Sequence, residues 1–386
     1  MQEFLSQVPF SGSFRQFQNR GGIFSPEGLW FSSLLLLIFP VYLGHFSLEG
    51  LPIARYLIYG AAVAAYLALL FKILLLDDRS LLQLSLIGGT LLVLCVGCVY
   101  SGSRCIMTTF LLILSAKGIS FRKIAQFFFG FFVVTAILNF GLLAAGVIED
   151  MVTIRGEAIG YGNIRHSLGF GHPNNLGFWA MMIVFSGLLA FEKEKTWRIC
   201  LVFSLLAAAV FFLCDSKAAF GASFLAIIGF AVAEKAEKRL NSFRSLPLLA
   251  VCSVLLIVLC YTVLSLIYHE DNRFLDLINT ALSQRPLYSH NALEQFGISL
   301  LGSRPDFKWD PVDCLYTYAP ICLGLIPSLI YLGLAMWSMY RAARHRKWSI
   351  VAVHLAAAIY SIMEYALLNP VHIPLFAAMA QLDDSE

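Results

Sequence analysis

Charge is scarce in this chain, and its scarcity sets the class of protein. Only 13% of the 386 residues are Asp, Glu, Lys or Arg, whereas 59% are hydrophobic and the mean hydropathy is +0.76. A soluble domain has about 25% charged residues, because its surface must face water. The sequence therefore predicts an all-α polytopic membrane protein. The net charge of only +3 gives no support for nucleic-acid binding.

Signatures of cofactor and metal sites are also missing. The chain has no glycine-rich nucleotide loop after a strand, no helical His pair at zinc spacing and no Walker-type sequence. Cys95 and Cys98 have the spacing of a redox pair, but they lie in an apolar run, where thiols behave as small hydrophobes. We expect no cofactor and no metal. No cleavable signal peptide is evident in residues 1–29.

What the sequence does contain is a series of apolar runs long enough to cross a bilayer. We predict about 12 transmembrane helices with both termini cytoplasmic, because 18 of the 27 Lys and Arg residues then lie in inner segments and nine in outer ones. Residues 1–29 are expected to form a cytoplasmic or interfacial segment, and 30–386 a single bundle. The predicted spans are 30–47, 52–71, 81–100, 105–116, 124–147, 174–191, 197–213, 216–233, 246–268, 314–340, 348–365 and 370–380.

Two predicted outer loops, 148–173 and 269–313, are longer than the other connections and rich in charged side chains. Loops of such length usually carry function. In the first loop, His172-Pro173-Asn174 opens an apolar run, and Pro173 favours a helix that starts there and continues to about Phe191. The free N–H groups of such a helix end bind anions.

Two other outer spans also begin with polar or charged residues. Asp215, Ser216 and Lys217 precede one apolar run, and Asp313 precedes another. A cation at an outer turn works against the positive-inside bias, so Lys217 is a candidate for binding rather than for topology. If these helix ends converge, their dipoles and cations form an anion site at headgroup level, which suits a diphosphate.

Each of these residues also has a purely structural interpretation. An Asp before a helix is commonly an N-cap, which applies to Asp215 and Asp313. His166 and His172 could be hydrogen-bonded loop histidines, and Arg155 and Arg165 could pair with nearby carboxylates or lipid phosphates. Arg285 follows an amphipathic stretch at 274–282, predicted to be a short helix on the membrane surface, and could cap it.

The motifs together resemble a known family. Arg165-His-Ser-Leu-Gly-Phe-Gly-His-Pro-Asn174, followed by an apolar span, resembles a motif of Wzy-type capsular and exopolysaccharide polymerases, within the O-antigen polymerase and ligase superfamily. Asp215-Ser-Lys-Ala-Ala-Phe-Gly-Ala222 is similar to the family's Ser-Arg-(Ser/Thr)-Gly segment, with Lys217 where arginine is usual. Ser283-Gln-Arg285 resembles the Ser-Gly-Arg that opens the large outer loop. Asp313-Cys314 is similar to the polymerase Asp-Asn segment, with Cys314 in place of Asn.

The resemblance implies a metal-independent membrane glycosyltransferase with a GT-C-like helical fold. Such an enzyme moves a growing glycan from undecaprenyl diphosphate to the next lipid-linked repeat unit, at the outer face of the bacterial cytoplasmic membrane. Its expected partners are those lipid-linked repeat units, membrane lipids, and a chain-length regulator and flippase of the same pathway. No nucleic acid is expected.

On this interpretation, Arg165 and Arg285 stabilise the departing diphosphate, because guanidinium groups grip phosphate oxygens bidentately. Asp313 is the first choice for the general base and His172 the second. The remaining candidates contact diphosphate or sugar, and they are Lys217, His166, Asn174, Ser216, Arg155 and Tyr316.

Two other functions remain open from the sequence. A ligase of the same superfamily would pass the glycan to a different acceptor, and it is expected to have a histidine where this chain has Asp313. A lipid-linked oligosaccharide flippase would place ionisable residues deep within its spans, whereas here they gather in outer loops.

Overall fold

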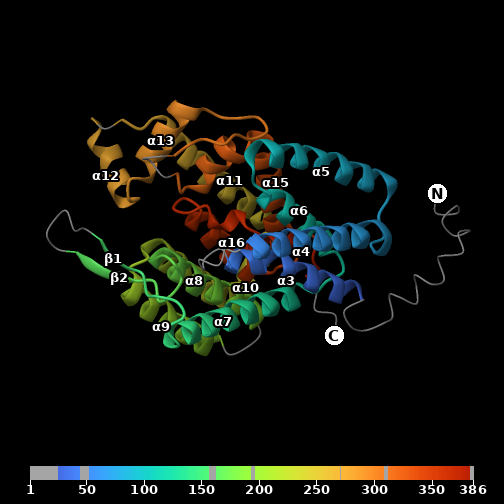
Figure 1. The fold of residues 1–386 in the computed structure, drawn as a ribbon, viewed down its shortest axis with the longest axis horizontal. Coiled ribbons are helices and arrows are strands. Elements are labelled where there is room, and N and C mark those ends of the chain that lie inside the picture. Colours follow the sequence, from blue (N-terminus) through green and yellow to red (C-terminus); the bar gives the residue numbers. More distant parts are fainter. Residues whose placement is uncertain are drawn as a thin grey trace, which may run out of the picture.

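The computed structural model describes residues 25–43, 52–155, 162–192, 196–269, 271–307 and 312–382. The predicted interfacial segment 1–29 lies almost wholly outside these ranges. The described chain folds into helices that pack side by side, with one small hairpin at an edge (Figure 1). The longer helices are α3 (Pro26–Leu43), α4 (Pro52–Phe71), α5 (Leu81–Ser101), α6 (Cys105–Ser115), α7 (Phe121–Ala144), α8 (Pro173–Ala190), α9 (Thr196–Cys214), α10 (Lys217–Leu240), α11 (Leu246–Leu266), α15 (Leu325–Arg344) and α16 (Trp348–Tyr360).

Short elements fill the connections. Helices α12 (Arg273–Ala281), α13 (Arg285–Phe296) and α14 (Leu315–Tyr318) occupy the long loop and its end. The π-helical segments are η2 (Lys72–Leu76) and η4 (Ala319–Leu323), and the 3₁₀ segments are η5 (Ala366–Leu368) and η6 (Ile373–Ala378). The helix predicted at 274–282 is therefore present as α12.

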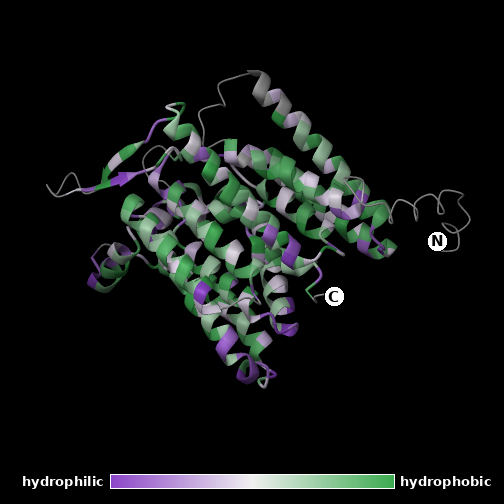
Figure 2. Cartoon of the chain, turned by 90° about the horizontal axis from the view of Figure 1, so that it is seen from below, coloured by the Kyte–Doolittle hydropathy of each residue, from purple (hydrophilic) through white to green (hydrophobic). Residues whose placement is uncertain are grey.

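Seven helices in the described ranges are long and apolar enough to cross a bilayer. Many of their large apolar side chains face outward, for example Leu92 on α5 and Phe212 on α9. Hydrophilic residues gather instead at helix ends and on the hairpin (Figure 2). Apolar surface on this scale is stable against lipid rather than water. The chain is a helical membrane protein, as its composition predicts, while the 12 spans and the orientation stay predictions.

Two predicted spans have a different form in the structure. The range 314–340 is interrupted at Gly324, whose φ of 102° only glycine adopts readily and whose added Cβ would lie 2.5 Å from the backbone of Gly302. The range 370–380 contains no α-helix, because Pro370 and Pro374 deprive it of backbone donors. It forms η6 and packs along α15, where Trp337 and Arg341 donate hydrogen bonds to its carbonyl groups. Irregular backbone at membrane depth is tolerated when protein buries it in this way.

Helix α8 lies at the centre of the fold and is buried over most of its length. It packs against α7, α9, α10 and α16. Gly177 permits the close approach of α10, since a Cβ there would lie 2.4 Å from the Cβ of Ser216 at the start of that helix. The predicted start at Pro173 and end near Phe191 are confirmed.

The prediction of an all-helical chain misses one element. Residues of the predicted outer loop 148–173 form an antiparallel hairpin of β1 (Val152–Arg155) and β2 (Asn163–His166), with Thr153 opposite Arg165. Four-residue strands are too short for their alternation to stand out in sequence. The hairpin places Arg165 and His166 near the N-terminal end of α8.

Candidate functional site

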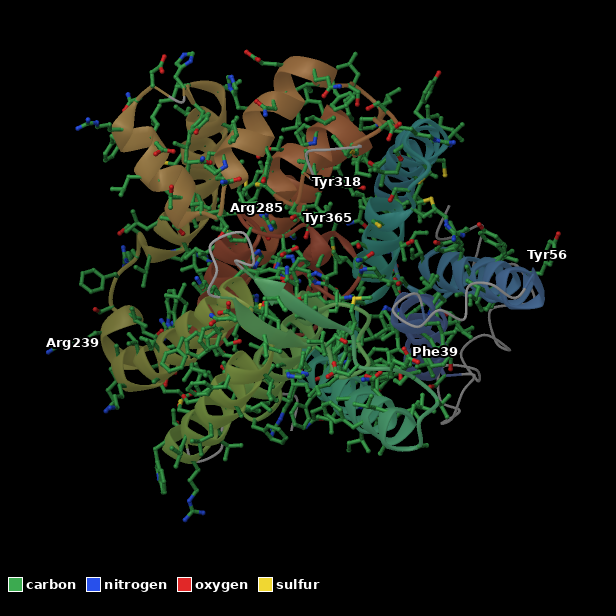
Figure 3. All side chains as sticks on the ribbon, turned by 60° about the vertical axis from the view of Figure 1, so that its left-hand side comes forward. Phe39, Tyr56, Arg239, Arg285, Tyr318 and Tyr365 are labelled. Atoms are coloured by element: carbon green, nitrogen blue, oxygen red, sulfur yellow. The ribbon has the colours of Figure 1, made fainter. Side chains whose placement is uncertain are left out.

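Several of the predicted residues meet where six segments lie close together. These are the end of β2, the starts of α8, α10 and α13, and the turns that flank α14 and follow α16. Arg285 begins α13, and its side chain is labelled in Figure 3. Its side chain provides the shortest ion pair of the cluster, because its Nη2 lies 2.7 Å from Oδ2 of Asp313.

Arg285 interacts with two carboxylates. Its Nη2 is also 3.8 Å from Oε1 of Glu364, and its Nε donates to the carbonyl of Met363 at 3.2 Å. The side chains of Arg285, Asp313 and Glu364 are 15%, 26% and 20% exposed, so the cluster is shielded but still open on one side. Arg285 begins α13 and does not cap α12, and Asp313 binds a cation rather than capping α14.

Asn174 connects this cluster to the first motif. Its Nδ2 donates to Oε1 of Glu364 at 3.2 Å, while its Oδ1 accepts from Nη2 of Arg165 at 2.6 Å. Arg165 also donates from Nε to the carbonyl of Cys214 at 2.7 Å. One polar network therefore runs from Arg165 through Asn174 and Glu364 to Arg285 and Asp313. It joins motifs that lie up to about 200 residues apart in sequence.

His172 faces the same network from the start of α8. Its Nδ1 accepts the N–H of Asn174 at 3.1 Å, so it caps the helix, and the proton of its neutral ring is on Nε2. Burial lowers the pKa of His172, Arg165 lowers it further and Asp313 opposes this. A neutral ring with Nε2–H exposed is a hydrogen-bond donor, which favours a phosphate-orienting role over a role as base.

The two carboxylates have shifted proton affinities. Burial raises the pKa of Glu364 to about 7, and the nearby charge of Asp313 adds to this shift, while Arg285 counteracts it. Burial also raises the pKa of Asp313, against the opposing charges of Arg285 and His172. Carboxylates with raised pKa values accept protons more readily near neutral pH, which is what general bases require.

Glu364 was missed in the sequence, although a signal was present. Glu364 is the one Asp, Glu, Lys or Arg residue in the sequence range of the predicted span 348–365. An acidic residue at the predicted outer end of the span is therefore conspicuous. Ionisable residues within or at the ends of apolar spans are costly and usually functional. In the structure α16 ends at Tyr360, and the turn that follows places Glu364 in the cluster.

Backbone strain is concentrated in the same motifs. Among the described residues, five that are not glycine have left-handed backbone angles. Four of them lie in the motifs that supply the cluster: Leu168, Asp215, Ser283 and Gln284. Such conformations cost of order 1–3 kcal/mol each and tend to persist at functional sites. Ser283 and Gln284 directly precede Arg285, so this turn fixes the point from which the Arg285 side chain enters the cluster.

The other predicted residues surround the network without joining it. Ser216 is buried at the start of α10, and Lys217 beside it is exposed, with no hydrogen-bond or ion-pair partner in the described part of the chain. His166 binds Asp150 through Nδ1 at 2.6 Å. Asp150 also accepts the N–H groups of Ser167 and Leu168, so this pair stabilises the loop.

Tyr316 lies away from the cluster, and the side chain of Arg155 is outside the described part of the structure. The hydroxyl of Tyr316 donates to the carbonyl of Ala358 at 2.6 Å, which turns it toward α16. Arg155 ends β1 opposite Asn163, and the position of its side chain is not described.

The cluster combines guanidinium groups with carboxylates, which is the chemistry of an anion site with a base. No group of three or more His, Cys, Asp and Glu residues suited to a metal ion occurs within the described ranges. Searches against protein families, curated proteins and solved structures found no match to this chain.

Proposed function

We propose that the protein is a polysaccharide repeat-unit polymerase. It transfers a growing glycan from undecaprenyl diphosphate to the next lipid-linked repeat unit, at the outer face of a bacterial cytoplasmic membrane. The observation that supports this most is the single network of two arginines, two carboxylates and a neutral histidine at the ends of apolar helices. These are the groups that a diphosphate leaving group and a hydroxyl nucleophile require.

In the first step, the side chain of Arg285 exchanges its carboxylate partner for a phosphate group of the donor. At rest, Arg165 and Arg285 balance the charges of Asp313 and Glu364. A bound diphosphate adds negative charge, so Arg285 turns toward it and Glu364, with a pKa of about 7, takes up a proton. Asp313 is thereby released from its ion pair.

Bond exchange follows at the anomeric carbon of the donor sugar. The acceptor hydroxyl attacks this carbon and gives its proton to Asp313, while the bond from the carbon to the diphosphate oxygen breaks and leaves both electrons on oxygen. Arg165, Arg285 and Nε2–H of His172 stabilise that oxygen and its neighbours. Fixed donors of this kind each contribute roughly 100- to 1,000-fold in rate.

The proposal is tested by reconstituting the protein in liposomes with one synthetic lipid-linked repeat unit. Gel analysis of the glycan is expected to show a ladder of regularly spaced products. Transfer of a single unit to a foreign acceptor would instead indicate a ligase, and movement across the bilayer without a new glycosidic bond would indicate a transporter. Either result would overturn the proposal. Arg273→Gln, at an exposed position on α12, is the matched control and keeps the ladder.

A further inference from the structure

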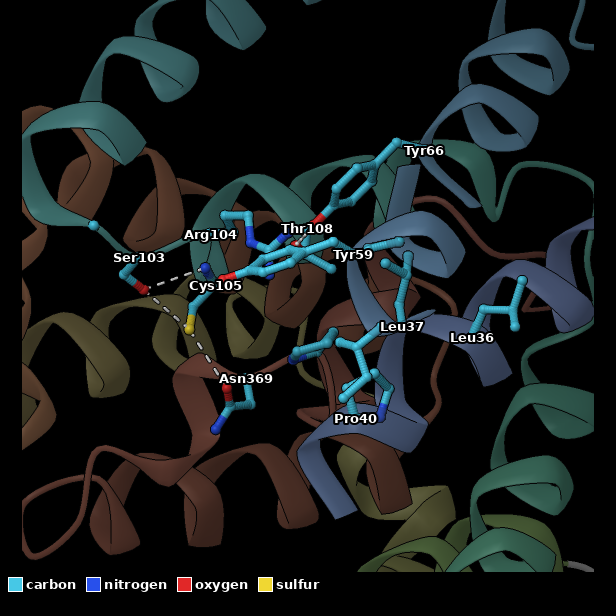
Figure 4. A pocket seen from close by; sticks show the side chains of 14 residues that line it. Leu36, Leu37, Pro40, Tyr59, Tyr66, Ser103, Arg104, Cys105, Thr108 and Asn369 are labelled. Atoms are coloured by element: carbon cyan, nitrogen blue, oxygen red, sulfur yellow. Dashed lines mark hydrogen bonds between the residues drawn. The ribbon is translucent and has the colours of Figure 1, made fainter. Parts of the chain in front are cut away.

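The molecule contains a second cationic cavity apart from the network. It has a volume of about 470 Å³ and lies between α3, α4, α6 and the chain at Asn369 and Pro370. Leu36, Leu37 and Ala62 make its apolar wall, and Figure 4 shows Arg104 beside the ring of Tyr59. Leu36 and Tyr59 are 40% and 49% exposed, so the cavity is open on the lipid-facing side of these helices.

Arg104 is suited to hold an anion there. Its guanidinium carbon lies 5.1 Å from the centre of the Tyr59 ring, and it has no carboxylate partner in the described chain. No acidic residue lines the cavity. Helix α6 begins at Cys105, next to Arg104, so its positive end faces the same space. Arg304 touches the rim at Gly102 and adds a second cation.

Two stacked tyrosines connect this cavity with the network. The rings of Tyr318 and Tyr365 are 4.2 Å apart and nearly parallel. Tyr365 is within electrostatic range of Asp313 and Glu364 in the network and also of Cys105, a cavity residue. It is 37% exposed, which leaves ring surface on which the C–H face of a sugar can pack.

We propose that this cavity binds the acceptor lipid, with its diphosphate at Arg104 and the first part of its isoprenoid chain along Leu36, Leu37 and Ala62. The inference rests on the proposed function for the identity of the lipid. The donor diphosphate must lie at the reaction centre, because its bond to sugar breaks. The acceptor diphosphate does not react and must lie one repeat unit away, with its sugars between the two. A separate cation, an apolar wall and an aromatic pair toward the network meet these needs.

The test is photo-cross-linking in phosphatidylcholine nanodiscs, with a diazirine-bearing geranylgeranyl diphosphate as the probe. Mass spectrometry is expected to find cross-links on α3, α4 and α6. Arg104→Gln should lower them about tenfold, since a charge-assisted hydrogen bond is lost, and Arg104→Lys should retain most of them. Arg273→Gln is the control and leaves them unchanged.

Competition identifies the source of the phosphate. Undecaprenyl diphosphate should displace the probe, whereas equal concentrations of phosphatidylglycerol or inorganic diphosphate should not. Displacement by either of these would overturn the proposal, as would cross-links that Arg104→Gln leaves unchanged. This binding assay needs no turnover. Ladder formation without cavity cross-links would reject the cavity alone, and cavity cross-links without a ladder would reject the proposed polymerase alone.

Discussion

At the level of residues, two neighbouring carboxylates have different tasks in the proposed reaction. Asp313 is held by Arg285 at 2.7 Å, whereas Glu364 is 3.8 Å from the same nitrogen and is also bound by Asn174. The tighter pairing makes Asp313 the group released when Arg285 turns to phosphate. Glu364 then adjusts the charge of the site by its protonation.

Asp313→Asn tests the assignment of the base. The amide cannot accept the hydroxyl proton, so turnover should fall by roughly 100- to 10,000-fold, the range typical of general bases. Donor binding should persist, because the neutral amide places no negative charge beside the phosphate. Ladder formation and donor binding in liposomes are the two measurements. Full turnover in this variant would leave Asp313 as a structural partner of Arg285 only.

Glu364→Gln tests proton uptake on binding. Glu364 has a pKa of about 7, so it is increasingly ionised above this pH and then repels the donor diphosphate. The wild-type dissociation constant for a donor with a blocked acceptor hydroxyl should rise by up to about tenfold from pH 6 to pH 8. The phosphates of such a donor do not titrate in this range. Glu364→Gln should bind equally at both pH values, and a slope that persists in it would contradict the role.

Most of these residues could be predicted from the sequence, but their arrangement in space could not. Arg165, His172, Arg285 and Asp313 stand out because charged groups at the ends of apolar runs are unusual. Glu364 was missed because it lies in a range assigned to a span. The hydrogen bonds of Asn174 to both Arg165 and Glu364 depend on tertiary packing, which no local pattern contains.

At the level of elements, the close approach of α8 and α10 positions the first two motifs. The contact of Gly177 with Ser216 sets this spacing, and the bond from Arg165 to the carbonyl of Cys214 depends on it. Packing this tight transmits small displacements directly to the site.

Gly177→Ala should therefore separate the two helices. Overpacking of this kind costs roughly 1–3 kcal/mol, and turnover should fall with it. Ser216→Gly removes the two atoms nearest to the new methyl group and leaves only the Cβ of Ala219 at 3.3 Å, so the double variant should recover stability and part of the activity. Gly221→Ala on α10, where a Cβ meets open space, is the control. Thermal unfolding in detergent measures the effect, and an unchanged melting temperature in Gly177→Ala would contradict this view of the contact.

Whether a segment forms a helix or a strand could be predicted where the hydrophobic periodicity or the composition gives a strong signal. It could be predicted less well elsewhere. Pro173 marks the start of α8 as expected. The chain at 370–380 was assigned as a helix on apolarity alone, although its two prolines argue against that form. The hairpin was missed because each strand has only four residues.

At the level of the whole molecule, the distribution of Lys and Arg predicts the orientation in the membrane. The site and the turn that contains Asp271 are predicted outside, and the turn between α10 and α11 near Ser242 inside. An epitope tag inserted after Asp271 should bind antibody in intact spheroplasts, whereas a tag after Ser242 should bind only after permeabilisation. The opposite pattern would place the site on the cytoplasmic side and remove the proposed substrate from reach.

The most direct test of the central claim is the stoichiometry of transfer in reconstituted liposomes. Undecaprenyl diphosphate released and glycosidic bonds formed would be counted together by mass spectrometry, for the wild type and for Arg285→Gln. We predict one diphosphate released for each bond formed by the wild type, and the loss of both products in Arg285→Gln. Chain growth without release of the diphosphate lipid, or equal release and growth in Arg285→Gln, would contradict the account.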